Sequence, residues 1–473
     1  MENQLIGRQY ELDLLQKRYE SNQAELVVVY GRRRVGKTFL VQQAFGNQFA
    51  FHLTGIYKVS KKQQLRNFAS TLANHSGRIL PPPRDWYEAF QQLRAYLETL
   101  GDRKSVVFID EMPWLDTAKS DLVSAFEQFW NGWGNTQPNL KIVLCGSATS
   151  WMVKNIFQNK GGLFNRDTPR IALNPFNLQE CEAFCQQREI PFSRYHIAQC
   201  YMILGGIPYY WDKLQKGMSL AQNIDALLFS QQALLKDEFA FLYATLFHRP
   251  QIYEDVVALL SQKHIGFTMQ EIAKKLHVGV GGNLTKVLKN LQACNMVLCN
   301  YSYGEKKELH YQLADFFTLF YLRFVKDNFG KDYTYWQVHQ DKPDTYVWRG
   351  YAFQMLCEAH IKQLRHALRI DNVNVELATF AKKGTETAKG AQIDLLIKRE
   401  DKVVNLCEMK CVDDVFEITK SYSEQLLNKV QTFQSVSPKR TSTHLTMVTT
   451  FGIKPNKYAS LVQQEITLDD LFA

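Results

Sequence analysis

The nonapeptide YGRRRVGKT, residues 30–38, decides the fold of the N-terminal part of this chain. It follows the apolar run at residues 26–29, which is typical of a buried parallel strand. Residues 39–44 come next, and their apolar spacing is typical of a helix. A strand, a loop of the form G-x-x-x-x-G-K-[ST] and a helix together make a phosphate-binding P-loop. The sequence therefore predicts a nucleotide site at residues 30–38.

Each position of this loop has a physical role. Gly31 and Gly36 let the backbone bend so that its N–H groups point at phosphate oxygens, and the new helix adds its positive N-terminal end. Lys37 is expected to reach the β- and γ-phosphates, and the Thr38 hydroxyl to be a ligand of Mg²⁺. The predicted cofactors are therefore ATP and Mg²⁺. The predicted nucleotide site also includes the intervening loop residues Arg32, Arg33, Arg34 and Val35.

Two further strands are predicted to end in polar residues. Residues 105–111, SVVFIDE, are four apolar residues that lead into two acids, the pattern of a Walker B motif. Asp110 would hold Mg²⁺ through water, and Glu111 would polarise the attacking water. After the strand at residues 141–146, Ser147 is the first choice for a sensor of the γ-phosphate and Thr149 the second. Open α/β sheets bind ligands at this carboxyl edge.

An arginine is expected to complete the ATPase site. Arg166 is the first candidate for an arginine finger and Arg170 the second, acting within the chain or from a neighbouring subunit. An arginine supplied by a neighbouring subunit would require an oligomer. Either arginine could equally be an ordinary surface residue without a role in hydrolysis. From residue 178 to 236 the sequence is largely helical, with a Gly-Gly-x-Pro breaker at residues 205–208.

Length and composition limit the remaining choices. The 473 residues correspond to about three domains, and the apolar content of 45% is enough to form packed cores. The net charge of +9 favours a nucleic-acid partner only if it is concentrated on one face. Nine cysteines without CxxC or zinc spacing favour reduced thiols in the cytoplasm. No apolar run approaches membrane length, so no membrane partner is expected.

Residues 250–313 predict a winged helix. Helical spacing at residues 252–260 is followed by a helix that begins with a capping box, Thr268 with Glu271. The third helix, residues 283–294, has polar residues away from its apolar stripe, and two strands flank residues 304–307. DNA binding by this third helix and a structural or protein-binding use of the module both remain open. The polar residues are Lys286, Lys289 and Asn290.

The last part of the chain predicts a helix at residues 348–368 and two paired strands, residues 390–397 and 403–410, around a turn. Asp394 is expected to end a polar turn and enter the first strand. Glu408 and Lys410 share one face of the second strand. Two acids and a lysine in this arrangement can bind Mg²⁺ and orient a water for phosphodiester cleavage. An ordinary hairpin with a surface salt bridge is the alternative.

Several short sequences together resemble the archaeal-type ATPase family, an AAA-like branch of P-loop proteins related to STAND ATPases. The triple-arginine loop is the most specific of them, and the resemblance extends over nearly the whole chain. It implies ATP binding and hydrolysis, and it leaves the biological task open. The matching boxes are Ile6-Gly7-Arg8, residues 31–38, Phe108-Ile109-Asp110-Glu111, Gly146-Ser147 and Gly205-Gly206-Ile207-Pro208.

The C-terminal pattern resembles the PD-(D/E)XK nuclease fold. The resemblance implies that Asp394 and Glu408 are metal ligands and that Lys410 is the catalytic lysine. The fold usually adds a glutamate on the first helix, directly after an aromatic residue. Here Phe353 is followed by Gln354, and Glu358 lies one helical turn later on the same face.

The sequence as a whole predicts an α/β protein. A P-loop parallel sheet at residues 1–177 is followed by a helical lid at 178–248, a winged helix at 249–325 and an α/β restriction-endonuclease-like domain at 326–473. One functional reading is an ATP-hydrolysing protein whose C-terminal half is associated with DNA, with Mg²⁺-dependent nuclease activity as an addition. The other is a STAND-like nucleotide switch that binds a protein or DNA partner without cleaving nucleic acid.

Overall fold

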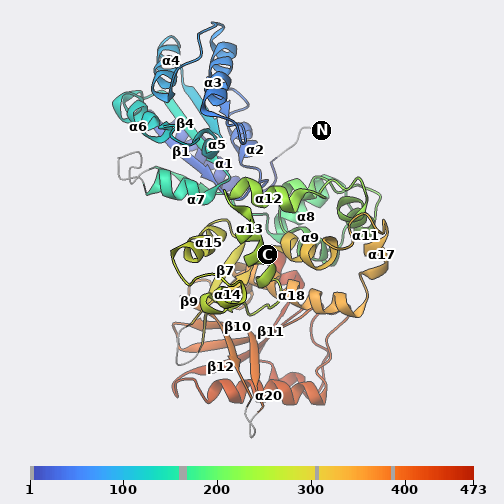
Figure 1. The fold of residues 1–473 in the computed structure, drawn as a ribbon. Coiled ribbons are helices and arrows are strands. Elements are labelled where there is room, and N and C mark those ends of the chain that lie inside the picture. The colour runs from blue at the N-terminus through green and yellow to red at the C-terminus, as the bar shows by residue number, and fades with distance from the viewer. Residues whose placement is uncertain (1–4, 159–167, 304–307, 385–388) are drawn as a thin grey trace. The chain divides into compact units, whose positions relative to one another are not determined.

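The computed structural model describes residues 5–158, 168–303, 308–384 and 389–473, which form two compact units (Figure 1). The first unit comprises Met1–Pro175 and Ala244–His248, and the second comprises Phe176–Tyr243 and Arg249–Ala473. Within the described ranges, no helix has the length and apolar character needed to cross a membrane.

The first unit contains a parallel sheet of five strands in the order β2-β3-β4-β1-β5. Its central strands are apolar and buried along nearly their whole length, as expected of a parallel sheet covered on both faces. The predicted parallel P-loop sheet is confirmed. The strands are β1 Glu25–Tyr30, β2 Phe51–Thr54, β3 Ser105–Asp110, β4 Leu140–Gly146 and β5 Arg170–Ala172.

Helices cover both faces of this sheet. On one side α1 and α2 contact β1 and β4, and on the other α3, α4 and α6 form a second layer. Helices of the second layer begin with N-capping side chains. The Asp85 side chain, for example, accepts a hydrogen bond from the Glu88 amide at the start of α4. The helices are α1 Gln9–Glu20, α2 Lys37–Ala44, α3 Lys61–Ser76, α4 Trp86–Glu98, α5 Met112–Leu115, α6 Leu122–Gly132 and α7 Thr149–Met152, with short turns η1 Gly134–Thr136 and η2 Val153–Phe157.

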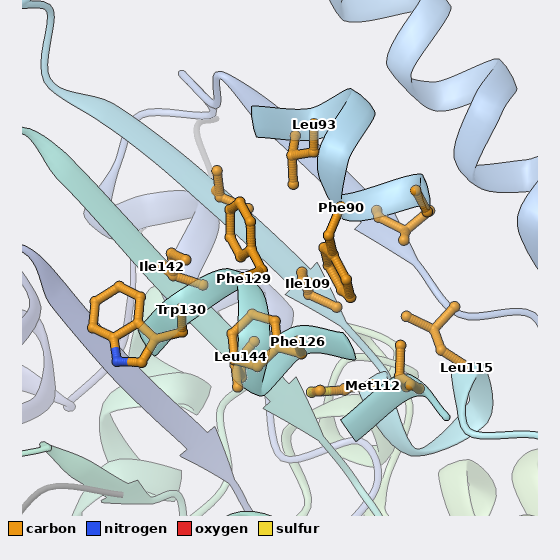
Figure 2. Packing of buried hydrophobic residues seen from close by; sticks show 14 of the residues in the cluster. Phe90, Leu93, Ile109, Met112, Leu115, Phe126, Phe129, Trp130, Ile142 and Leu144 are labelled. Atoms are coloured by element: carbon orange, nitrogen blue, oxygen red, sulfur yellow. The ribbon is translucent and has the colours of Figure 1, made fainter. Parts of the chain in front are cut away.

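Aromatic rings pack together with aliphatic side chains in the core beneath the second layer (Figure 2). Phe90 of α4 stacks on Phe129 of α6 with their ring centroids 5.3 Å apart, and both belong to the cluster that covers Ile142 and Leu144 of β4. Burial of such side chains contributes about 1.5–3 kcal/mol each. This packing fixes β3 and β4, so the polar residues at their carboxyl ends stand on rigid strands.

The order of the strands indicates where this sheet would bind a ligand. After β1 the chain crosses to β2 at the far side of the sheet, returns through β3 and β4, and adds β5 on the other side of β1. β1 therefore lies between β4 and β5, where consecutive connections run in opposite directions. Ligands of open α/β sheets bind at such a switch point, outside the carboxyl ends of the strands.

The second unit contains a mixed sheet of eight strands in the order β13-β12-β11-β10-β9-β7-β8-β6. Its strands come from two of the predicted domains: β7 and β9 pair in parallel, with Tyr301 opposite Ala378. The segments predicted as winged helix and nuclease-like domain therefore share one sheet. The strands are β6 Phe267–Thr268, β7 Val297–Ser302, β8 Leu309–Leu313, β9 Val375–Lys382, β10 Ala391–Arg399, β11 Val403–Lys410, β12 Ser442–Thr449 and β13 Gln464–Thr467.

The remaining elements of the second unit are helical. The segment predicted as the lid supplies α8 and α9, which pack on α16, α18 and the C-terminal turn η6. The helices are α8 Leu178–Gln187, α9 Arg194–Leu204, α10 Pro208–Trp211, α11 Leu220–Ile224, α12 Glu238–Leu246, α13 Pro250–Leu260, α14 Met269–Lys275, α15 Gly282–Ala293, α16 Phe316–Phe320, α17 Tyr335–His339, α18 Pro343–Ala359, α19 Ile361–Ala367 and α20 Lys420–Gln434, with short turns η3 Asp225–Phe229, η4 Tyr321–Val325, η5 Ala459–Leu461 and η6 Leu468–Phe472.

Two local expectations were wrong. The helix predicted at residues 348–368 is two helices, α18 and α19, which are separated at His360 with φ −107° and ψ 33°. Asp394 does not end a turn, because β10 already begins at Ala391. It lies instead where the pairing of β10 with β9 shifts register between Ile393 and Leu396. Such a bulge redirects the side chain it carries.

Candidate functional site

Glycines shape the predicted P-loop. Gly31 has φ +148°, and a Cβ there would lie 2.2 Å from the Leu173 carbonyl oxygen, so no other residue fits without a backbone shift. Gly36 has φ +91° and is the residue from which α2 starts. At the end of β4, a Cβ on Gly146 would lie 2.7 Å from the Met152 sulfur. Glycine is thus required at residue 31 by the close approach of the Leu173 backbone and at residue 146 by the close packing of Met152.

Lys37 lies across this loop. Its ammonium is buried and donates a hydrogen bond of 2.9 Å to the Arg32 carbonyl oxygen. A buried ammonium requires such an acceptor, and phosphate oxygens would supply stronger, charged ones. The position is therefore suited to holding a phosphate over the loop.

Thr38 and Asp110 meet although 72 residues separate them. The Thr38 hydroxyl donates to Asp110 Oδ2 at 2.7 Å, and Asp110 is only 4% exposed. A hydroxyl and a carboxylate are the hard oxygen ligands that Mg²⁺ prefers, directly or through water. The residues present therefore fit this ion, with Thr38 and Asp110 as those that would hold it beside the loop.

Glu111 is held by the residue predicted as the γ-phosphate sensor. The Ser147 amide and hydroxyl donate to the same carboxylate oxygen, Glu111 Oε2, at 3.1 and 2.7 Å. Glu111 itself has a left-handed backbone (φ 47°, ψ 47°), and its amide donates to Asp110 Oδ1 at 2.9 Å. A Cβ on Gly55 would lie 2.6 Å from the Glu111 carbonyl oxygen, so the strained turn is also enclosed. The structure places Ser147 as the positioning partner of Glu111.

The other loop residues lie around this centre. Arg32 and Val35 are buried, and Arg34 has φ 69°. The Arg33 guanidinium lies over the ring of Trp114, 5.5 Å from its centroid, a cation–π contact. Sequence reasoning missed Trp114, because an aromatic residue three positions after the acids belongs to no motif.

Trp114 is held by a second residue that the sequence did not reveal. The Gln64 amide, fully buried, donates to the carbonyl oxygens of Trp114 and Ile56 at 2.8 and 2.7 Å. Of the arginine-finger candidates, Arg166 lies outside the described residues. Arg170 at the start of β5 lies over the Phe157 ring, 4.6 Å from its centroid.

In the second unit, Asp394 and Gln354 adjoin each other. Asp394 Oδ2 accepts a hydrogen bond of 2.9 Å from the Met409 amide of β11. The Gln354 side chain of α18 donates to the Asp394 carbonyl oxygen at 2.9 Å and to Glu358 Oε1 at 3.1 Å. Burial raises the pKa of Glu358 to about 7. The residue that departs from the nuclease pattern therefore connects the Glu358 carboxylate with the Asp394 backbone.

Glu408 is buried, at 1% exposure, and is paired with Lys429 of α20. The Lys429 ammonium donates to both carboxylate oxygens at 2.7 Å, and the Tyr422 hydroxyl lies 3.4 Å from one of them. Burial, followed by the nearby Asp394 charge, raises the pKa of Glu408 to about 7 in spite of Lys429. Lys429 was not predicted, since a lysine on a later helix carries no motif. Lys410 lies over the Tyr422 ring at 5.2 Å.

A cleft of about 760 Å³ opens beside these residues. Asp394, Lys410 and Gln354 line it together with cations from the end of α13 and from η4. These cations are exposed, and in the described part of the chain they form no salt bridge with a carboxylate, although Asp327 lines the same cleft and the charges of Lys326 and Lys263 act on Glu254 and Glu271. The additional cations are Lys263, Arg323 and Lys326.

The predicted recognition helix is α15. Lys286 and Lys289 are exposed on it, as its spacing predicts. Asn290 instead joins α15 to α13, because its amide donates to the Tyr253 hydroxyl at 2.8 Å. Strand β7, the first strand of the predicted wing, pairs with β9 of the nuclease-like segment. Just after β7, Tyr303 packs on Phe433 with ring centroids 5.0 Å apart.

The parallel sheet, the glycine-shaped loop and the acids of β3 together define a P-loop ATPase. Residues 5–214 match the model of a family described as an ATPase domain predominantly from Archaea. This N-terminal part of the chain is similar to that family.

Known proteins extend the comparison over more of the chain. An uncharacterised protein of Methanocaldococcus jannaschii is 25% identical over 417 residues, which cover 86% of this chain and 88% of the relative. A Walker-type ATPase of Pyrococcus abyssi has a TM-score of 0.46 at 18% identity, covering 67% of this chain and 96% of that one. The ORC2 protein of Aeropyrum pernix has a TM-score of 0.42 at 13% identity, covering 69% and 96%.

Proposed function

We propose that this protein binds and hydrolyses ATP with Mg²⁺, and that its C-terminal half associates with DNA. The observation that carries the first part is the meeting of Thr38 with Asp110 beside a loop of P-loop geometry. The match of residues 5–214 to the model of an ATPase family supports the same activity. Free cysteines in the described residues are consistent with the proposed cytoplasmic location.

The roles of the chain's own residues follow from their positions. The loop backbone and Lys37 bind the phosphates, while Thr38 and Asp110 would hold Mg²⁺, which supplies charge neutralisation when bound. Glu111 orients and polarises the attacking water. Ser147 keeps the Glu111 carboxylate in one position through two hydrogen bonds.

The P-loop assignment is tested by Lys37→Ala. The variant should lose ATP binding by at least about 100-fold, because the phosphate charge loses a buried, charged donor. Isothermal titration calorimetry with a non-hydrolysable ATP analogue measures this. Lys104→Ala is the matched control, since Lys104 is an exposed lysine of the same unit. ATP affinity in Lys37→Ala equal to that of the control would refute the assignment.

The DNA-associated part rests on the cleft. Lys263, Arg323 and Lys326 line one opening, and in the described residues none of them is paired with a carboxylate at salt-bridge distance. Asp327 also lines the cleft, so the three cations outnumber this acid, and their charge favours a polyanion. The exposed Lys286 and Lys289 of α15 offer a second basic surface in the same unit.

Point variants distinguish the two surfaces. Arg323→Ala and Lys326→Ala should each weaken binding of a fluorescent DNA oligonucleotide and reduce the slope of log affinity against log salt by about 1. Lys362→Ala, an exposed lysine of α19 away from the cleft lining, is the control. Fluorescence anisotropy over a salt series gives both quantities. An unchanged slope in the cleft variants together with a reduced slope in Lys286→Ala and Lys289→Ala would move the DNA site to α15.

A nucleotide switch with a protein partner is the second candidate. It is favoured by the wing strand: β7 is paired with β9, and Tyr303 packs on Phe433, so the hairpin that a DNA-bound wing would use is engaged within the sheet. Wild-type protein that binds no DNA at low salt in either nucleotide state would favour this function.

A further inference from the structure

The acids of the nuclease-like site can be tested for their fit to a divalent cation. A Mg²⁺ ion takes carboxylate and water oxygens as ligands. Both oxygens of Glu408 already accept hydrogen bonds from the Lys429 ammonium at 2.7 Å. Glu408 is almost fully buried, so its pairing is not exchanged freely with solvent.

The second part of the site has a neutral glutamine where the nuclease pattern has an acid. Gln354 is neutral, and its amide nitrogen, a donor, faces the Asp394 carbonyl oxygen and Glu358. Asp394 Oδ2 is occupied by the Met409 amide. In the described residues no group of three His, Cys, Asp or Glu side chains is arranged to hold a metal ion. The donor set therefore does not fit Mg²⁺.

The charges of the surrounding side chains also make the site a poor fit for Mg²⁺. The carboxylates of Asp394 and Glu408 are opposed by the ammonium groups of Lys429 and Lys410, which lie on α20 and β11. Both ammonium groups would repel a divalent cation placed between these carboxylates, in a region that solvent screens poorly.

We propose that Lys429 takes the place of a metal ion in this site, so that the C-terminal domain holds a nucleic-acid strand in its basic cleft without a divalent cation and does not cleave it. The binding half of this statement rests on the proposed DNA association. The absence of a functional metal site rests only on Lys429, Glu408 and Gln354. The two parts fail separately.

Metal binding is measured directly with Mn²⁺, by electron paramagnetic resonance of the full chain without nucleotide. Wild type and Asp394→Asn should bind the same number of ions, because Asp394 contributes to no site. The double variant Gln354→Glu/Lys429→Met restores an acid and removes the internal cation, and it should gain one Mn²⁺. Adding Asp394→Asn to the double variant should remove that ion.

Two results would overturn the proposal. One is a Mn²⁺ ion in wild type that Asp394→Asn removes, a comparison that does not depend on the folding of the double variant. The other is a folded double variant, checked by circular dichroism, that gains no ion. DNA affinity in EDTA is expected to be at least equal to that in Mg²⁺, because Mg²⁺ competes with the basic cleft for the phosphates. Affinity that falls in EDTA would contradict binding without a divalent cation. No DNA binding under either condition would refute the proposed DNA association and leave the metal result standing.

Discussion

At the scale of single residues, the ATPase centre depends on pairs that are distant in sequence. Motif spacing predicted Lys37, Thr38, Asp110 and Glu111 as a set, since each belongs to a pattern with a known physical role. The contact between Ser147 and Glu111 was not predictable. It depends on the left-handed turn at Glu111, which no local sequence rule specifies. Lys429 escaped prediction for a similar reason, because only the fold brings α20 to Glu408.

The role of Ser147 can be separated from that of Thr149. Ser147→Ala removes a hydrogen bond to a charged group, and it should lower kcat by about 10- to 100-fold, equivalent to about 1.5–3 kcal/mol, with little change in ATP affinity. Thr149→Val is the matched control, since the buried Thr149 hydroxyl has no partner in the described residues. Steady-state ATP hydrolysis measures both variants. A slow Thr149→Val with a normal Ser147→Ala would reverse the assignment.

At the scale of elements, the sequence predicted each strand of the P-loop sheet that carries a motif, because long apolar runs with polar ends have few alternative structures. It did not predict the junction of α18 and α19 or the shared eight-stranded sheet. The pairing of Tyr301 with Ala378 joins segments far apart in the chain, and periodicity carries no information on such partners. The domain boundaries predicted from composition stay predictions.

His360 joins three of these elements. The Leu178 amide at the start of α8 donates to His360 Nε2 at 3.0 Å, and Nδ1 lies 2.8 Å from the Leu356 carbonyl oxygen of α18. Burial lowers the pKa of His360 from 6.5 to about 4. A histidine whose pKa is lower in the folded state stabilises the fold above pH 6.5, and this contribution is lost as the pH falls toward 4. It amounts to about 3 kcal/mol.

The pH dependence of unfolding tests the contribution of His360 between α8 and α18. Between pH 7 and pH 4.5 the wild-type protein should lose more stability toward urea than His360→Gln, which cannot take up the proton. His366→Gln replaces an exposed histidine of α19 and should retain the wild-type dependence. Equal pH dependence in wild type and His360→Gln would show that His360 does not supply this contribution.

At the scale of the whole molecule, the described chain combines a P-loop ATPase unit with a second unit. Residues of the second unit's sheet line a cleft together with three exposed cations. The chain passes between the units three times, after residues 175, 243 and 248. ATP chemistry is assigned to the first unit and nucleic-acid binding is proposed for the second. We expect ATP hydrolysis and nucleic-acid binding to respond to different substitutions, since no residue is required by both.

Substitution of Glu111 is the most direct test that the first unit hydrolyses ATP. Glu111→Gln keeps the size of the side chain and removes the charge that polarises water. ATP hydrolysis and ATP-analogue affinity are measured on the same preparation. We expect unchanged affinity for the ATP analogue and a turnover lowered by about 100-fold or more, whereas wild-type turnover in Glu111→Gln would show that Glu111 does not activate the water.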